Sequence, residues 1–115
     1  MENVRLFNTV FDKFVDDLII FFPENTKLKV YKNKFLAARK INVTSPVNIF
    51  FDTFGDSGTH IMSEDIEYFK NDMRFQNELG IFENWDQYSD DKKTIVWQYM
   101  KSLYIICNKA LGVSS

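Results

Sequence analysis

Apolar side chains recur at steps of three and four over residues 3–22, and this spacing limits what the chain can fold into more than any other feature. Such a repeat lines up on one side of an α-helix, because successive residues are rotated by about 100°. The stripe consists of Val4, Phe7, Val10, Phe11, Phe14, Val15, Leu18, Phe21 and Phe22. Pro23 follows and ends the helix, because the residue before a proline is pushed out of the helical region.

Four further segments show helical spacing or helix-start signals. We expect helices at residues 24–41, 46–54, from 63 to about 73, and at 89–111. Their ends carry capping residues: Ser45 before Pro46, Ser89 before two aspartates, and Gly112 after the last apolar turn. Residues 55–62 are predicted to form a loop, and residues 74–88 an irregular segment with a short turn at 82–85. The sequence therefore predicts an all-α fold, a compact bundle of about five helices in a single domain spanning residues 1–115.

The segment at 89–111 has the widest apolar arc. Its inward positions are Ile95, Val96, Tyr99, Met100, Leu103, Ile106, Cys107 and Ala110, and Trp97, Tyr104 and Leu111 widen the arc. A helix that is apolar over so much of its circumference needs neighbours on several sides. We therefore expect the C-terminal helix at the centre of the bundle.

The composition favours a well-packed interior without metal or disulfide support. Aromatic residues make up 17% of the chain, with twelve Phe, five Tyr and two Trp, and large rings bury much apolar area. One cysteine cannot form an intramolecular disulfide, which suits a reducing compartment. The N-terminus does not read as a secretory signal, and the longest apolar run, residues 18–22, is far below the roughly 20 residues of a membrane span. An intracellular protein without a membrane span is expected.

Residues 55–58 read Gly-Asp-Ser-Gly, the tetrapeptide around the nucleophile of trypsin-like proteases. That mechanism needs a general-base histidine and an oxyanion hole on a rigid scaffold. Here His60 lies only three residues after Ser57, and the chain reads as helical and short. We interpret residues 55–58 as a helix C-cap followed by a flexible loop.

Neither His60 nor Cys107 lies in a metal-ligand or nucleophile pattern. No second histidine or cysteine stands at ligand spacing, so His60 is interpreted as a surface or loop residue. Cys107 falls on the inward arc of the last helix, where a buried, inert thiol is expected. The sequence predicts no catalytic residue, no metal site, no cofactor and no evident small-molecule substrate. A site assembled from scattered carboxylates stays open as an alternative.

Charge is distributed unevenly along the chain. Residues 26–42 carry six basic residues and no acidic one, whereas residues 61–91 carry nine acidic residues against Lys70 and Arg74. On a helix the basic residues gather on one face, and we predict a partner-binding surface formed by Lys29, Lys32, Leu36, Arg39 and Lys40. Such a face suits an acidic protein partner or the phosphates of a nucleic acid, and a solvated helix side explains it as well.

Two stretches resemble small, uncharacterised α-helical proteins of large DNA viruses of eukaryotes. Residues 14–23, FVDDLIIFFP, match a "DLI..FP" helix ending, and residues 94–103, TIVWQYMKSL, match an "IWxYhxxL" helix. The tryptophan here follows two aliphatic residues rather than one. The resemblance implies a viral, non-secreted helical protein, with a place in the host cytoplasm, the nucleus or the virion, and it carries no catalytic residues to transfer.

These observations lead to two functional hypotheses. The first is a non-enzymatic protein-interaction or structural protein that binds a protein partner or itself. The second is a nucleic-acid-associated module that uses the basic face of the second predicted helix.

Overall fold

The computed structural model describes residues 1–113, without the side chains of residues 76–78, and the regular elements of this part are all helical. The chain forms α1 (Glu2–Phe21), α2 (Thr26–Ile41), α3 (Ser45–Phe54), α4 (Gly58–Met62), α5 (Ile66–Asn71), α6 (Met73–Glu78), the 3-10 helix η1 (Trp85–Gln87) and α7 (Asp90–Leu111). The predicted all-α bundle is confirmed. No helix in the described residues is long and apolar enough to cross a membrane.

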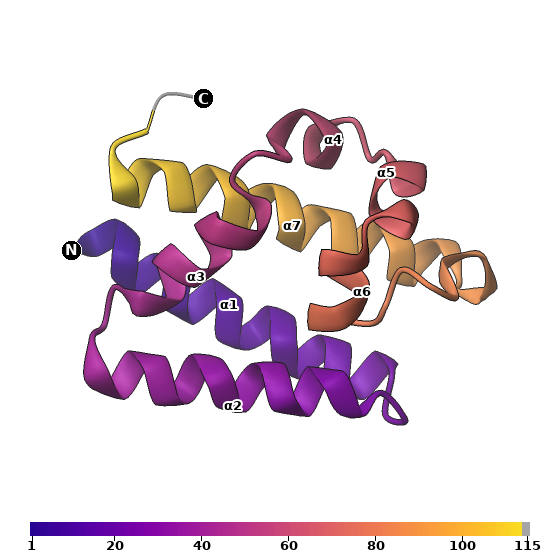
Figure 1. Cartoon of the computed structure of the whole chain (residues 1–115), viewed down its shortest axis with the longest axis horizontal. Helices are drawn as coiled ribbons and strands as arrows, with labels where there is room; N and C mark the ends of the chain where they lie inside the picture. Colours follow the sequence, from indigo (N-terminus) through magenta and orange to yellow (C-terminus); the bar gives the residue numbers. More distant parts are fainter. Residues whose placement is uncertain (114–115) are drawn as a thin grey trace.

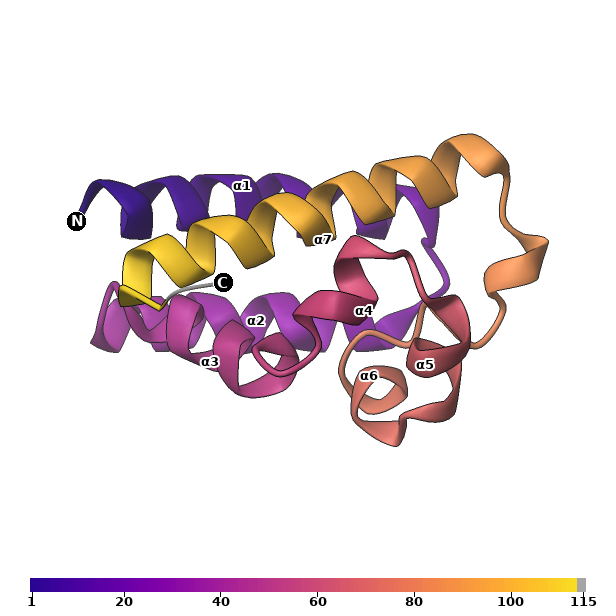
Figure 2. The same ribbon diagram turned by 90° about the horizontal axis from the view of Figure 1, so that it is seen from above.

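The two longest helices, α1 and α7, run antiparallel and lie side by side (Figures 1 and 2). The other flank of α1 is covered by α2, and α3 lies against α1, α2 and α7. Because α7 also contacts α4, the prediction that the C-terminal helix lies at the centre is confirmed. The short helices α4 to α6 lie together in the half of the molecule that holds the start of α7 (Figure 2).

Rings from α1, α2 and α3 pack together in the core. Phe7 packs edge-on against Phe50 of α3, with ring centroids 5.4 Å apart. Phe11 stacks on Phe35 of α2 at 4.0 Å. Aromatic pairs of this kind stabilise by about 0.5–1.5 kcal/mol beyond the area that they bury.

The segment from residue 55 to residue 88 is more regular than the sequence indicates. The predicted loop at 55–62 is wrong, since it contains α4, and the segment described as irregular contains α6 and η1. The predicted turn at 82–85 is present, because the N–H of Trp85 donates to the carbonyl of Phe82 at 3.3 Å. Helices of five or six residues show less than two turns of apolar spacing, which is too short a pattern to identify from sequence.

The fourth predicted helix, starting at Ser63, is also wrong in its bounds. Glu64 has φ of 56°, a left-handed conformation that interrupts any helix through it. The helix begins instead after Asp65, whose carboxylate accepts the N–H of Tyr68 at 3.3 Å. A new helix starts after Asp72, which caps α6 through the N–H of Arg74. Met73, the apolar residue at the end of the predicted helix, is exposed, because this break changes the direction of the chain.

Gly58 lets α4 approach α7 closely. A Cβ atom at this position would lie 2.1 Å from the hydroxyl oxygen of Tyr104 and 2.2 Å from its Cζ. Gly58 is itself buried. Close packing of α4 against Tyr104 therefore explains why the second residue of type Gly in the Gly-Asp-Ser-Gly tetrapeptide has no side chain.

Tyr99 joins the two central helices by a polar contact. Its hydroxyl donates to a carboxylate oxygen of Asp17 on α1 at 2.6 Å. This hydrogen bond, together with burial, raises the pKa of Tyr99 to about 12. The contact links α7 to α1 on the rim of their apolar interface.

Substituting Gly58→Ala should lower the free energy of unfolding by about 1–2 kcal/mol, because the added methyl group overpacks the α4–α7 contact. Urea unfolding followed by circular dichroism measures the change. In a Tyr104→Ala background the same substitution should cost less than half as much, since the ring that it meets is gone. Equal costs in both backgrounds would show that Tyr104 is not the obstacle.

Substituting Tyr99→Phe should lower the free energy of unfolding by about 1 kcal/mol at neutral pH. The folded-state pKa of Tyr99 lies above its unfolded value of about 10, so its contribution is complete below pH 10 and is lost as pH rises toward 12. Unfolding curves of both proteins at several pH values should therefore converge between pH 10 and pH 12. A difference that stays constant over this range would contradict the assignment.

Candidate partner-binding face on α2

The start of α2 is fixed by Asn25 rather than by Glu24, where the sequence placed it. The side-chain oxygen of Asn25 accepts the N–H groups of Lys27 and Leu28 at 2.9 and 3.4 Å. Its amide nitrogen donates to the carbonyls of Leu79 and Gly80 at 2.9 and 3.2 Å. One side chain therefore caps α2 and ties it to the segment that follows α6.

The buried side of α2 decides which residues point outward. Leu28, Tyr31 and Phe35 recur at steps of three and four and are buried against the core. Asn42 follows the last residue of the helix, which ends at Ile41, as the predicted bounds of 24–41 require. The cations Arg39 and Lys40 lie in the last turn, where positive charge stabilises the negative end of the helix dipole.

The five predicted partner-binding residues divide into two groups. Lys32 and Arg39 lie on the flank that faces α1. Lys32 pairs with Asp16 at 2.9 Å, and Arg39 makes two hydrogen bonds to Asp12, at 3.1 and 2.5 Å. The hydrogen bond to Asp12 raises the pKa of Arg39 above its ordinary value, so this cation stays charged and engaged within the molecule.

The other three predicted residues, Lys29, Leu36 and Lys40, point to solvent, and two apolar residues that the sequence analysis missed join them. Val30 is 68% exposed and Ile41 88% exposed, compared with 38% for Leu36. The signal that identifies them is their position off the Leu28–Tyr31–Phe35 stripe. We call the five exposed residues Lys29, Val30, Leu36, Lys40 and Ile41 the exposed α2 face.

The geometry of the exposed α2 face is regular. Lys29 and Lys40 are eleven residues apart, and so are Val30 and Ile41, which is about three helical turns. Each pair therefore points in one direction. Lys29 and Lys40 form one row, with Leu36 between them, and Val30 and Ile41 form a second row beside it. No acidic residue lies in α2 to neutralise the cations locally.

The Gly-Asp-Ser-Gly tetrapeptide does not present a nucleophile. Gly55 caps α3, as predicted, but Ser57 is fully buried. Its hydroxyl hydrogen-bonds to the hydroxyl of Tyr68 at 2.9 Å and donates to Asp56 at 3.2 Å. The contact with Tyr68 holds the α3–α4 turn against α5.

His60 lies in α4 and is fixed from two directions. Its Nδ1 lies 2.9 Å from a carboxylate oxygen of Asp65, and its ring stacks on Tyr68 with centroids 3.7 Å apart. The hydrogen bond with His60 lowers the pKa of Asp65. Among the described residues, no group of three or more histidine, cysteine or acidic side chains is placed to hold a metal ion.

Cys107 is buried, as predicted. Its thiol points to the carbonyl of Val47 at 3.5 Å, and burial raises its pKa to about 12. A thiol in this setting is protonated at neutral pH and is a poor nucleophile.

Comparison with protein-family models, with curated proteins and with solved structures found no match to this chain.

Substituting Lys32→Glu should lower the free energy of unfolding by about 0.5–1 kcal/mol, because it removes an ion pair and places a second carboxylate beside Asp16. Lys29→Glu is the matched control, since it makes the same change of charge one turn earlier on the exposed side. It should leave stability unchanged within about 0.5 kcal/mol. Urea unfolding at low salt measures both, and an equal loss in the two variants would contradict the division of the cations into two groups.

Proposed function

We propose that this protein is a non-enzymatic binding protein that contacts an acidic partner protein through the exposed α2 face. The observation that carries the proposal is the row of exposed aliphatic side chains, Val30 and Ile41, beside the row of Lys29 and Lys40. Removing aliphatic side chains from water in an interface with a partner stabilises the complex. Lysines favour a negatively charged partner and steer its approach. The two rows together match an amphipathic, acidic surface.

Nucleic-acid binding is the second candidate. The absence of acidic residues from α2 supports it, because phosphate contacts need uncompensated cations. Two of the four predicted cations, however, are paired with aspartates of α1. Exposed valine and isoleucine side chains also add nothing to phosphate binding. Protein binding uses all five residues of the exposed α2 face, whereas nucleic-acid binding uses two of them.

The non-enzymatic part of the proposal is supported by the state of the reactive side chains. Ser57 is buried and engaged by Tyr68 and Asp56. Cys107 is buried, with a raised pKa. His60 is half-buried and engaged by Asp65. Neither Ser57 nor Cys107 serves as a ready nucleophile for an external substrate.

The setting of this function is proposed from the sequence alone. The stretches at residues 14–23 and 94–103 support a viral protein that acts inside the host cell or in the virion. Detection of the protein in purified virions would favour a structural role, and its presence only in infected cells would favour an interaction with a host or viral partner.

The exposed α2 face is tested by fluorescence anisotropy with three labelled probes: an acidic amphipathic helical peptide, a DNA oligonucleotide and an RNA oligonucleotide. We expect the peptide to bind. Substituting Val30→Ser together with Ile41→Ser should weaken its binding by about tenfold, because two apolar contacts are lost. Substituting Lys29→Glu together with Lys40→Glu should also weaken it, and added salt should have the same effect.

The apolar variant separates the two candidate functions. Ile105→Ser changes an exposed side chain on α7 and should leave peptide binding unchanged. Nucleic-acid binding that falls with salt, is lost in the lysine variant and survives in the apolar variant would establish the second candidate instead. Sedimentation of the free protein shows whether a second copy is the partner.

A further inference from the structure

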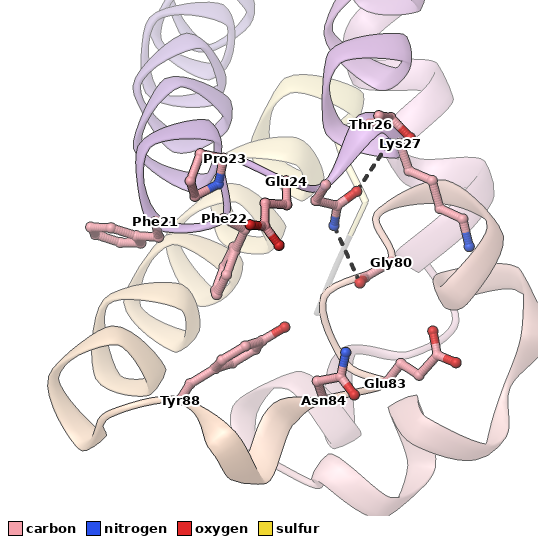
Figure 3. A pocket seen from close by; sticks show the side chains of 11 residues that line it. Phe21, Phe22, Pro23, Glu24, Thr26, Lys27, Gly80, Glu83, Asn84 and Tyr88 are labelled. Carbon is pink, nitrogen blue, oxygen red and sulfur yellow. Dashed lines mark hydrogen bonds between the residues drawn. The ribbon is translucent and has the colours of Figure 1, made fainter.

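A pocket of about 620 Å³ lies between the turn that joins α1 to α2 and the segment at residues 80–88. Its volume is within the range of small-molecule sites in proteins. The hydrogen bonds of Asn25 to the carbonyls of Leu79 and Gly80 hold its two sides together. Figure 3 shows the pocket with these two sides facing each other.

Aromatic rings form the apolar part of the lining. Phe22 and Tyr88 pack with their centroids 4.3 Å apart, and Figure 3 shows the hydroxyl of Tyr88 pointing into the open space. The ammonium group of Lys92 lies 5.8 Å from the centroid of Phe22 and 5.9 Å from that of Phe21. The aromatic side of the pocket thus already attracts a cation of the chain itself.

Four polar side chains of the lining, those of Glu24, Glu83, Asn84 and Tyr88, have no hydrogen bond or ion pair within the part of the chain that the structure describes. Several other acids between residues 61 and 91 are paired, for example Asp72 with Arg74 and Asp86 with Lys70. Burial raises the pKa of Tyr88, and the charge of Glu83 adds to this effect, so that carboxylate acts electrostatically on the hydroxyl.

The charges of the lining favour a cationic ligand. The lining itself contains two carboxylates and one lysine, Lys27, and Lys92 lies outside the lining, beside the rings of Phe21 and Phe22. Carboxylates repel a phosphate or a second carboxylate. Glu24 and Glu83 lie on opposite sides of the pocket (Figure 3), so a ligand that meets both needs donors pointing in several directions. A guanidinium has five N–H donors in one plane and stacks on aromatic rings, whereas an ammonium is a compact point charge.

We propose that this pocket binds an alkylguanidinium group, held by Glu24 and Glu83 and placed against the rings of Phe22 and Tyr88. The hydroxyl of Tyr88 and the side-chain oxygen of Asn84 complete the set of hydrogen-bond acceptors. The group belongs either to a free small molecule or to an arginine side chain. This site is separate from the exposed α2 face and stands whether or not that face binds a protein.

The test is a two-dimensional amide NMR titration of the full chain with n-butylguanidinium and with n-butylurea, its neutral counterpart of nearly the same shape. We expect n-butylguanidinium to shift the amide signals of Gly80, Asn84 and Tyr88 and to bind about tenfold more tightly than n-butylurea. Equal affinity for the two compounds, or no shift of these signals at the highest soluble concentration, would overturn the proposal.

Two double variants locate the charge that is responsible. Glu24→Gln with Glu83→Gln should weaken binding of n-butylguanidinium by about tenfold. Glu2→Gln with Asp52→Asn changes the net charge by the same amount at exposed positions outside the pocket and should leave binding unchanged. Equal losses in the two variants would reduce the effect to net charge and overturn the site.

A third titration, with N-acetyl-arginine amide, distinguishes the source of the group. Tighter binding than that of n-butylguanidinium supports an arginine side chain of a polypeptide, because the backbone then adds contacts. Weaker binding supports a free small molecule. The anisotropy of the acidic peptide on α2 should be unaffected by any of these ligands.

Discussion

Three phenylalanines on one side of α1 each pack against a different helix. Phe7 meets Phe50 of α3, Phe11 stacks on Phe35 of α2, and the ring of Phe14 lies 5.3 Å from that of Tyr99 on α7. The positions of α2, α3 and α7 around α1 therefore depend on the shape of one aromatic surface. Since buried rings are large and fit closely, few other arrangements fill the same space.

This packing also decides what remains exposed. Because Leu28, Tyr31 and Phe35 hold α2 against the core, the opposite side of the helix is left with Val30 and Ile41 in solvent. These exposed aliphatic side chains do not add to the stability of the isolated protein, because they stay in water. Its place beside a row of lysines is what supports a binding function rather than a purely structural one.

The short helices α4 to α6 are held by polar contacts together with buried apolar side chains. Tyr68 contacts Ser57 through its hydroxyl and His60 through its ring, and Phe69 and Phe75 bury the apolar side. Residues that resemble a catalytic set from sequence thus serve to fix short helices. The side chains of Glu83, Asn84 and Tyr88, which make no hydrogen bond or ion pair in the described part of the chain, lie elsewhere, in the pocket.

The sequence alone determined the four helices α1, α2, α3 and α7, because each is long enough for its apolar spacing and end signals to be read locally. It also determined that Cys107 and the Leu28–Phe35 side of α2 are buried. Only the tertiary structure decided that Lys32 and Arg39 pair with α1, because their partners come from another helix. The tertiary structure also decided where the helices between residues 58 and 78 form and where the pocket beside Tyr88 lies. Short segments carry too little periodicity to read, and the pocket exists only where Asn25 joins two parts of the chain that are far apart in sequence.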